Sequence, residues 1–353
     1  MYRIVVGFII AIVLTGCSQK ESSSIKKLRV NQKREIVDLA QKADSVFYVI
    51  PNKNVPFINN ISKILFTNEL MLIKDQSFIN NRPIFSMNYH GEFDKQYGTI
   101  GRGPGEYLSA FDIALQNSAR DLCLYDRDLQ RLLTFNLTTG DLTEKREMPF
   151  FMLQLMPLEE NILASLNDEE GGPELSIRDL KKSKNLLERY THDELTDIEI
   201  PKVFATVHDT NLFLRPSSDT IQMIQNHKLQ PLLHIDFGKY AIDQKFKELE
   251  GDVLKQQYMN NNRFCLLTGI FADKKNLLIA YLQKDKTHYL LLQNNAVKLH
   301  VERFQYRGKD LPKPIGLWKG YLVFCLFPEL FPNEVSPAHK NFYLAFFKIR
   351  NNS

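Results

Sequence analysis

The sequence predicts an all-β protein, a six-bladed β-propeller with four-stranded blades. Short runs rich in Val, Ile, Leu, Phe and Tyr recur from about residue 45 onward, separated by turn clusters of Asn, Asp, Gly, Ser and Pro. The runs group in fours with a period of roughly 40 residues, which matches the length of one propeller blade. No long helical period interrupts them before about residue 240.

Five complete four-strand units are predicted in order along the chain. The first is expected at 61–66, 70–74, 83–88 and 92–97, the second at 111–115, 121–126, 131–136 and 141–147, and the third at 151–156, 162–166, 174–179 and 186–190. The fourth is expected at 203–207, 211–215, 220–224 and 232–237, and the fifth at 264–271, 277–282, 288–293 and 297–303. Apolar residues at helical spacing predict a short helical insertion near 243–258.

The two ends of the chain are expected to share the sixth blade. The last segment supplies only three strands, at 315–318, 321–326 and 342–349, while the run 45–50 belongs to no unit. If this run pairs beside the last strand, the ring closes and no open edge remains. Two β-sandwiches would need a linker near the middle of the chain, and a β-helix would need shorter repeats; the sequence has neither.

The N-terminus has the features of an export signal. Arg3 supplies a positive start, and the apolar run 4–13 is too short to span a bilayer. The segment Leu14-Thr15-Gly16-Cys17 resembles the lipobox of bacterial lipoproteins, in which the cysteine carries lipid. We therefore expect a signal peptide at 1–16, lipidation at Cys17, and a location in the cell envelope, at the outer membrane.

Between this signal and the predicted propeller, the composition predicts a flexible tether. Residues 18–34 are rich in Ser, Lys and Gln and poor in apolar residues. The expected organisation is a lipidated cysteine and tether at 17–44 and a propeller at 45–350. The dispersed basic residues of the tether are expected to be a solvated spacer. The net charge of +4 is small for this length and does not indicate nucleic acid binding.

The other three cysteines lie in apolar, strand-like runs. Cys123, Cys265 and Cys325 are predicted to be buried thiols, because free cysteine is among the most buried residue types. A bridge between Cys265 and Cys325 stays open as an alternative.

No motif in the sequence predicts catalysis, a metal or a cofactor. A Gly-x-Ser-x-Gly elbow is absent, and the eight histidines show neither His-x-His nor His-Glu-x-x-His spacing. The acidic clusters at 126–128 and 168–170 lack the alternating spacing of a calcium loop and are predicted to be solvated turns. A cap of its strand turn is the alternative for Asp126. No catalytic residue, metal ligand or cofactor is therefore predicted.

A glycine-rich segment, Gly98-Thr99-Ile100-Gly101-Arg102-Gly103-Pro104-Gly105-Glu106-Tyr107, is the most distinctive part of the sequence. Together with 60–64, 91–93, 125–126 and 234–239, it resembles a family of bacterial six-bladed β-propeller lipoproteins of unassigned function, similar in shape to the NHL and TolB-like propellers. The glycine segment between Ile100 and Pro104 is shorter than in that family, and the last third of the chain matches poorly.

The glycine-rich segment is predicted to be a structural turn between the first two blades, with close backbone approaches at its glycines. A phosphate-binding loop is excluded, because Gly-Glu-Tyr stands where the Walker pattern needs Gly-Lys-Ser/Thr. The residues named as possible ligand contacts are Arg102 and Glu106 in this turn and Arg215 at a predicted strand end.

Two hypotheses about function follow. The first is a non-catalytic, membrane-anchored propeller that binds a glycan, peptide or partner protein through its loop faces. The second is an extracytoplasmic enzyme, a hydrolase or lyase, with its site in the central channel; this one rests on analogy with other propellers. Polar and charged side chains clustered in the channel would favour the second, and an apolar channel would oppose it.

Overall fold

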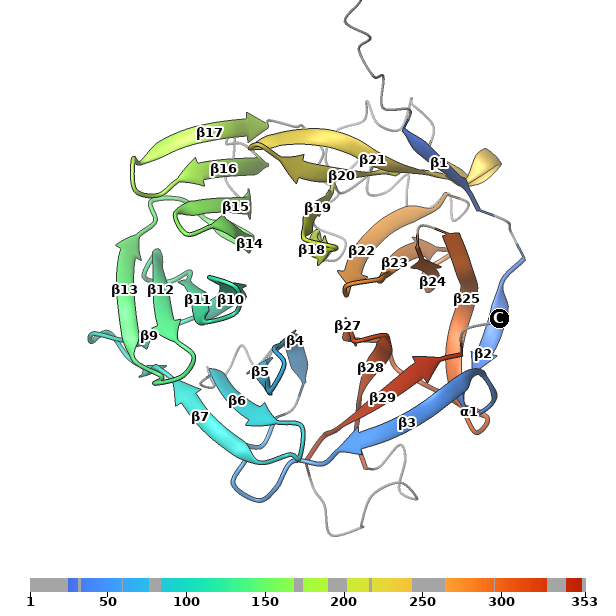
Figure 1. Cartoon of the computed structure of the whole chain (residues 1–353), viewed down its shortest axis with the longest axis horizontal. Coiled ribbons are helices and arrows are strands. Elements are labelled where there is room, and N and C mark those ends of the chain that lie inside the picture. Colours follow the sequence, from blue (N-terminus) through green and yellow to red (C-terminus); the bar gives the residue numbers. More distant parts are fainter. Residues whose placement is uncertain are drawn as a thin grey trace, which may run out of the picture.

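The computed structural model describes residues 25–30, 33–58, 60–75, 84–167, 174–189, 202–215, 218–242, 264–294, 296–328 and 341–350. Six antiparallel sheets are arranged in a ring around a central channel (Figure 1). Each sheet has four core strands in meander order. The predicted six-bladed β-propeller with four-stranded blades is confirmed.

The first five blades follow one another along the chain. They contain β4 (Ile61–Phe66), β5 (Leu70–Asp75), β6 (Ile84–Asn88) and β7 (Phe93–Tyr97); β10 (Ala110–Gln116), β11 (Asp121–Asp126), β12 (Arg131–Asn136) and β13 (Leu142–Glu147); and β14 (Met152–Glu159), β15 (Ile162–Asn167), β16 (Leu175–Asp179) and β17 (Lys184–Arg189). They continue with β18 (Phe204–Val207), β19 (Thr210–Leu214), β20 (Thr220–Gln225) and β21 (Lys228–Asp236); and β22 (Leu266–Ala272), β23 (Asn276–Gln283), β24 (Lys286–Gln293) and β25 (Ala296–Tyr306). Shorter elements are β8 (Thr99–Ile100), β9 (Glu106–Tyr107), β26 (Lys309–Asp310) and the 3-10 turn η2 (Gly238–Tyr240).

The meander order gives the ring two different faces. Four antiparallel strands return the chain to the face from which the blade started, so every inner strand begins at the same face. We call it the crossover face, because the chain passes from one blade to the next there. The other face carries the turns that follow each inner strand and precede each outer strand, and we call it the hairpin face.

Buried apolar residues fill the space between neighbouring blades. Central strands are buried on both sides, as β11 shows with five fully buried residues after Asp121. One core cluster joins blades one and two through Leu72, Tyr97 and Leu133, and another joins blades five and six through Leu291 and Phe324. Each blade is therefore held by packing on its neighbours, as expected for a repeat fold that buries its core between units.

The sixth blade is closed by both ends of the chain, as the sequence predicts. Its strands are β27 (Gly316–Trp318), β28 (Tyr321–Leu326), β29 (Tyr343–Ile349) and β3 (Ala43–Val49). Antiparallel pairing places Val49 opposite Leu344 and Phe47 opposite Phe346. The rings of Phe47 and Phe346 stack with centroids 4.4 Å apart. Figure 1 shows β3 as the outer strand beside β29.

The predicted flexible tether at 17–44 is wrong for residues 26–29 and 35–44, which form regular secondary structure. β1 (Lys26–Arg29) adds to the outer edge of β21, β2 (Glu35–Asp38) adds to that of β25, and α1 (Leu39–Lys42) leads into β3. Both additions are parallel. We call β1, β2 and α1 the N-terminal strap. The polar composition hid these strands, because two exposed strand edges supply the backbone partners and only single residues, such as Val37, enter the core.

Arg34, the residue directly before β2, connects the N-terminal strap to blade five. Its Nη1 donates to His288 Nε2 at 3.0 Å, and its guanidinium carbon lies 5.5 Å from the centroid of the Tyr281 ring. Burial and the Arg34 charge lower the pKa of His288 to about 4. The imidazole is therefore neutral at pH 7 and accepts the hydrogen bond.

The remaining sequence predictions have mixed outcomes. The helical insertion at 243–258 and the acidic cluster at 168–170 lie outside the described residues. The prediction of a solvated Asp126 is wrong, because this carboxylate is buried, pairs with Arg131 and accepts the N–H of Leu129 in its turn. Cys123, Cys265 and Cys325 are buried and free, so the bridge between Cys265 and Cys325 does not form. Burial raises the pKa of each thiol to about 12, which fits inert cysteines. Within the described part of the chain, no helix is long and apolar enough to cross a membrane.

A charge at the closing strand tests the ring closure. Val49 is 1% exposed in β3, whereas Val46 in the same strand is 39% exposed. Val49→Asp buries an unpaired carboxylate between β3 and its neighbours, so we expect the free energy of unfolding to fall by at least about 3 kcal/mol. Val46→Asp is the matched control and should change it by less than about 0.5 kcal/mol. Urea unfolding measures both; equal effects would contradict closure by β3.

Candidate functional site

Polar side chains gather in the central channel at its crossover end. The channel is lined by the inner strands β4, β10, β14, β18, β22 and β27 (Figure 1). Lys63, Asp112 and Gln154 lie near the start of β4, β10 and β14, and Lys202 lies just before β18. Because all inner strands begin at the crossover face, these four side chains from four blades come together there.

Asp112 connects three blades. It is 4% exposed, and its Oδ1 accepts a hydrogen bond and ion pair from Lys63 Nζ at 2.7 Å. Its Oδ2 accepts the backbone N–H of Leu155 at 2.9 Å. Gln154 extends the chain of contacts to blade four, since its Oε1 accepts the N–H of Val203 at 3.0 Å. The buried carboxylate is thus satisfied by one ammonium group and one amide, as a buried charge requires.

Lys202 is the most perturbed cation of this cluster. Its backbone pairs with Gly269, and its Nζ lies 4.5 Å from the centroid of the Phe271 ring. Burial lowers the pKa of the Lys202 amine to about 7; the charge of Lys63 adds to the lowering, and the charge of Asp112 opposes it. Among the described residues, no carboxylate forms an ion pair with Lys202. Perturbed groups of this kind concentrate at functional sites.

A third lysine lies next to this group. Lys74 on β5 is the cross-strand partner of Lys63 and donates to Ser62 Oγ at 3.0 Å. Burial lowers the pKa of Lys74, and Lys63 adds to this, whereas Asp112 and Asp75 oppose it. We call Lys63, Lys74, Lys202 and Asp112 the channel cluster; it contains three amines and one carboxylate.

The structure brings the predicted candidate Arg215 next to the channel cluster. Leu214 N donates to Val203 O at 2.8 Å, so Arg215 at the end of β19 is in register with Lys202. Its Nε lies 3.5 Å from Oε2 of Glu174 in blade three. Arg215 therefore joins blades three and four at the crossover face, one strand outward from the channel.

The other two candidates lie in the turn between blades one and two, as predicted, and do not reach the channel cluster. The Glu106 carboxylate accepts the N–H of Gly103 at 2.6 Å, and a Cβ on Gly101 would lie 2.1 Å from it. Positive φ occurs at Gly98 and Gly105. Glu106 therefore stabilises the turn itself.

Arg102 in the same turn is solvent-exposed, and it forms no ion pair with Glu106. The sequence prediction that these two residues contact a ligand is not tested by this arrangement.

Sequence reasoning missed Lys63, Lys74, Asp112 and Lys202. They come from three blades, and no local motif relates them. One signal was present: Asp112 is a charged residue inside the apolar strand run 111–115, and such a residue is buried only with a partner. In the described residues, no group of three or more His, Cys, Asp or Glu side chains is placed to hold a metal ion.

The ring of six four-stranded sheets and its polar channel define the molecule as a six-bladed β-propeller. The chain belongs to the DUF4934 family, described as a domain of unknown function, whose model matches residues 25–318. The match begins at the strap, which agrees with the place of β1 in the fold.

Two crystal structures of Bacteroides proteins have the same fold. One is a "putative exported protein" from Bacteroides fragilis, with a TM-score of 0.73, 16% identity, and coverage of 93% of this chain and 100% of that chain. The other is a member of the DUF4221 family from Bacteroides vulgatus, with a TM-score of 0.56, 9% identity, and coverage of 87% and 97%. At these identities the likeness shows the fold alone. No curated protein matches the chain.

The titration of Lys202 tests the electrostatics of the channel. After reductive methylation with ¹³C-formaldehyde, we expect one methylamine NMR resonance with a midpoint near pH 7, and its absence in Lys202→Arg. Lys63→Gln should raise this midpoint, because it removes a like charge that lowers the pKa of Lys202. If no resonance titrates below about pH 9, Lys202 is solvated and the cluster is not formed.

Proposed function

We propose that this protein is a lipid-anchored, extracytoplasmic propeller that binds an anionic ligand in its channel. The observation that carries the proposal is Lys202, whose amine is held at the crossover end of the channel without a carboxylate partner among the described residues. An anionic group of a ligand supplies the missing counter-charge. Its approach would raise the pKa of Lys202 and favour the charged amine.

The surroundings of Lys202 favour a glycan or peptide over a simple ion. The Phe271 ring lies beside the amine and offers an apolar surface to a sugar ring or side chain. Lys63 carries a second positive charge in the same cluster, although Asp112 neutralises it in part. A ligand that combines a carboxylate with a ring or amide fits this mixture of contacts.

The proposed location rests on the N-terminal sequence. Residues 1–17 have the order of a lipoprotein signal followed by a lipidated cysteine. The fold is shared with a Bacteroides fragilis protein described as a "putative exported protein". Cys17 stands nine residues before Lys26, where β1 begins, so even a fully extended chain holds the propeller within about 32 Å of the lipid. We place the protein at the outer membrane.

A second candidate function is an enzyme that uses the Lys202 amine. With a pKa of about 7, roughly half of this amine is neutral at pH 7, and a neutral amine acts as a base or nucleophile. This observation favours lysine chemistry in the channel. Turnover of a bound ligand, lost in Lys202→Arg, would distinguish the enzyme from the binding protein.

The anchor is tested by Cys17→Ala. We expect this variant to lose palmitate labelling and membrane retention in cells, because the thiol that receives the lipid is gone. Radiolabelled palmitate and membrane fractionation measure the two effects. Cys123→Ala is the control and should keep both, since that thiol is buried in the propeller. Labelling that persists in Cys17→Ala would contradict the anchor.

The channel site is tested with an acidic trisaccharide, trigalacturonate, and a neutral trisaccharide of the same length. We expect calorimetry to show binding of trigalacturonate alone, weakened at least about tenfold by Lys202→Met, since a charge-assisted contact is lost. Lys181→Met removes an exposed lysine from the hairpin face and is the matched control. No binding of trigalacturonate, or equal binding by Lys202→Met, would contradict the proposed site.

A further inference from the structure

A basic pocket lies between blades five and six, at the opposite end of the molecule from the channel cluster. It has a volume of about 350 Å³ and is bordered by the turns after β22 and β27, the end of β24 and the end of β29. All of these belong to the hairpin face. Its floor is apolar and buried, formed by Leu291, Leu317 and Leu322.

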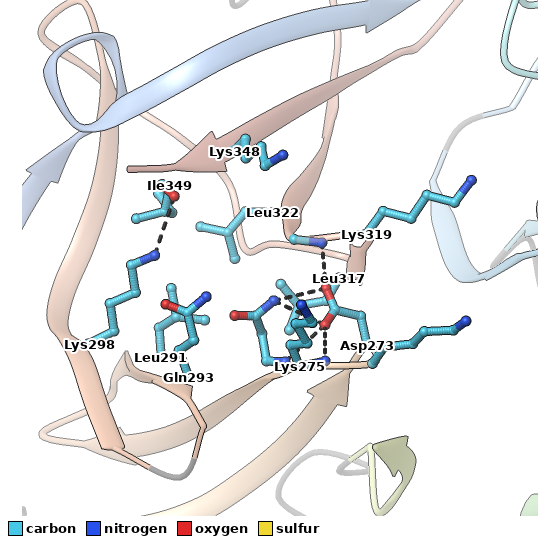
Figure 2. A pocket seen from close by; sticks show the side chains of 13 residues that line it. Asp273, Lys275, Leu291, Gln293, Lys298, Leu317, Lys319, Leu322, Lys348 and Ile349 are labelled. Carbon is cyan, nitrogen blue, oxygen red and sulfur yellow. Dashed lines mark hydrogen bonds between the residues drawn. The ribbon is translucent and has the colours of Figure 1, made fainter. Parts of the chain in front are cut away.

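Five lysines surround this floor. They are Lys274, Lys275, Lys298, Lys319 and Lys348. Figure 2 shows Lys298 on one side of the pocket and Lys319 on the other. Lys298 is partly buried; its Nζ donates to Ile349 O at 3.3 Å, and burial lowers its pKa. The other four are exposed. We call these five residues the lysine rim.

The residues that line the pocket do not neutralise the positive charge of the lysine rim. Asp273 is the only acidic residue among those that line it, and its oxygens are already used by the fold. Oδ1 accepts the N–H groups of Lys275 and Asn276, each at 2.9 Å, and Oδ2 accepts the N–H of Gly320 at 2.6 Å. Asp273 thus holds the two turns together, and the rim keeps an excess of positive charge that attracts anions.

The direction of β1 relates this face to the proposed anchor. β1 pairs in parallel with β21, an outer strand that runs from the hairpin face toward the crossover face. The chain therefore enters β1 from the hairpin-face side, and Cys17 is only nine residues upstream of Lys26. A connection of this length keeps the hairpin face within reach of the surface that carries the lipid.

We propose that the lysine rim binds phosphate-bearing lipid headgroups of the membrane to which the protein is anchored. The inference rests on the proposed anchor for its geometry. The charge of the rim is complementary to anionic lipid, each lysine near such a surface adds to the attraction, and the apolar floor accepts the glycerol or sugar part of a headgroup. Lipid at Cys17 and the rim then act as two attachments, which together fix the tilt of the ring.

The test uses the mature chain from residue 17, which contains every described residue, with Cys17→Ser so that no lipid is attached. The probe is sedimentation with vesicles of phosphatidylcholine containing about 30% phosphatidylglycerol, at low salt. We expect binding to these vesicles and none to pure phosphatidylcholine. Because this chain lacks lipid, the result does not depend on whether Cys17 is acylated.

Lysine variants assign the binding to the rim. The triple variant Lys275→Gln, Lys319→Gln and Lys348→Gln changes exposed residues only, and we expect at least about tenfold weaker vesicle binding. The matched control, Lys181→Gln, Lys182→Gln and Lys184→Gln, removes three exposed lysines from the same face at blade three and should bind like the parent chain.

Three outcomes would overturn the proposal: no binding to anionic vesicles, equal binding to neutral vesicles, or equal losses in the two triple variants. Competition with inorganic phosphate at constant ionic strength distinguishes a lipid headgroup from free phosphate as the anion that the rim binds. If phosphate displaces the protein from the vesicles only at phosphate concentrations far above the lipid concentration, the result supports binding to a membrane surface. Displacement at equal concentrations identifies a site for free phosphate and overturns the headgroup assignment.

Discussion

The antiparallel pairing of β3 with β29 is the constraint on which the rest of the structure depends. Without β3, the sixth blade would keep only β27, β28 and β29, no strand from the N-terminal part of the chain would hold the ring closed, and the outer edge of β29 would be unpaired. The N-terminal strand removes both problems, because Val49 and Phe47 enter the core of the sixth blade beside Leu344 and Phe346. The strap then continues outward from this strand, so its position on blades four and five also follows from the closure.

Closure gives the two faces of the ring different chemical characters. At the crossover face, Asp112 and Gln154 link four blades by hydrogen bonds and leave Lys202 beside Phe271. At the hairpin face, the lysine rim surrounds an apolar floor. If the rim meets lipid, the channel cluster is directed away from the membrane, toward ligands in the surrounding space. One geometry thus serves the proposed anchoring and the proposed binding.

The sequence was informative wherever structure is local. The strands of blade two and the turn between the first two blades followed from alternating apolar runs and turn residues. The distant partner for the incomplete sixth blade followed from counting strands along the chain. The strap was missed because β1 and β2 are short, polar and stabilised by edges far along the chain. The channel cluster was missed for a similar reason: Lys63, Asp112 and Lys202 are brought together only by the ring. Arg215 was named without a location, and the register with Lys202 supplies it.

Hydrogen exchange measured by mass spectrometry tests ring closure most directly. If β3 is an integral strand of the sixth blade, the amides of Ala43–Val49 exchange as slowly as those of Tyr321–Leu326 in β28, and both open only with global unfolding. If the amides of β3 exchange orders of magnitude faster, like those of a fraying terminus, the ring is not closed by this strand. The channel cluster and the strap would then lose the framework that positions them.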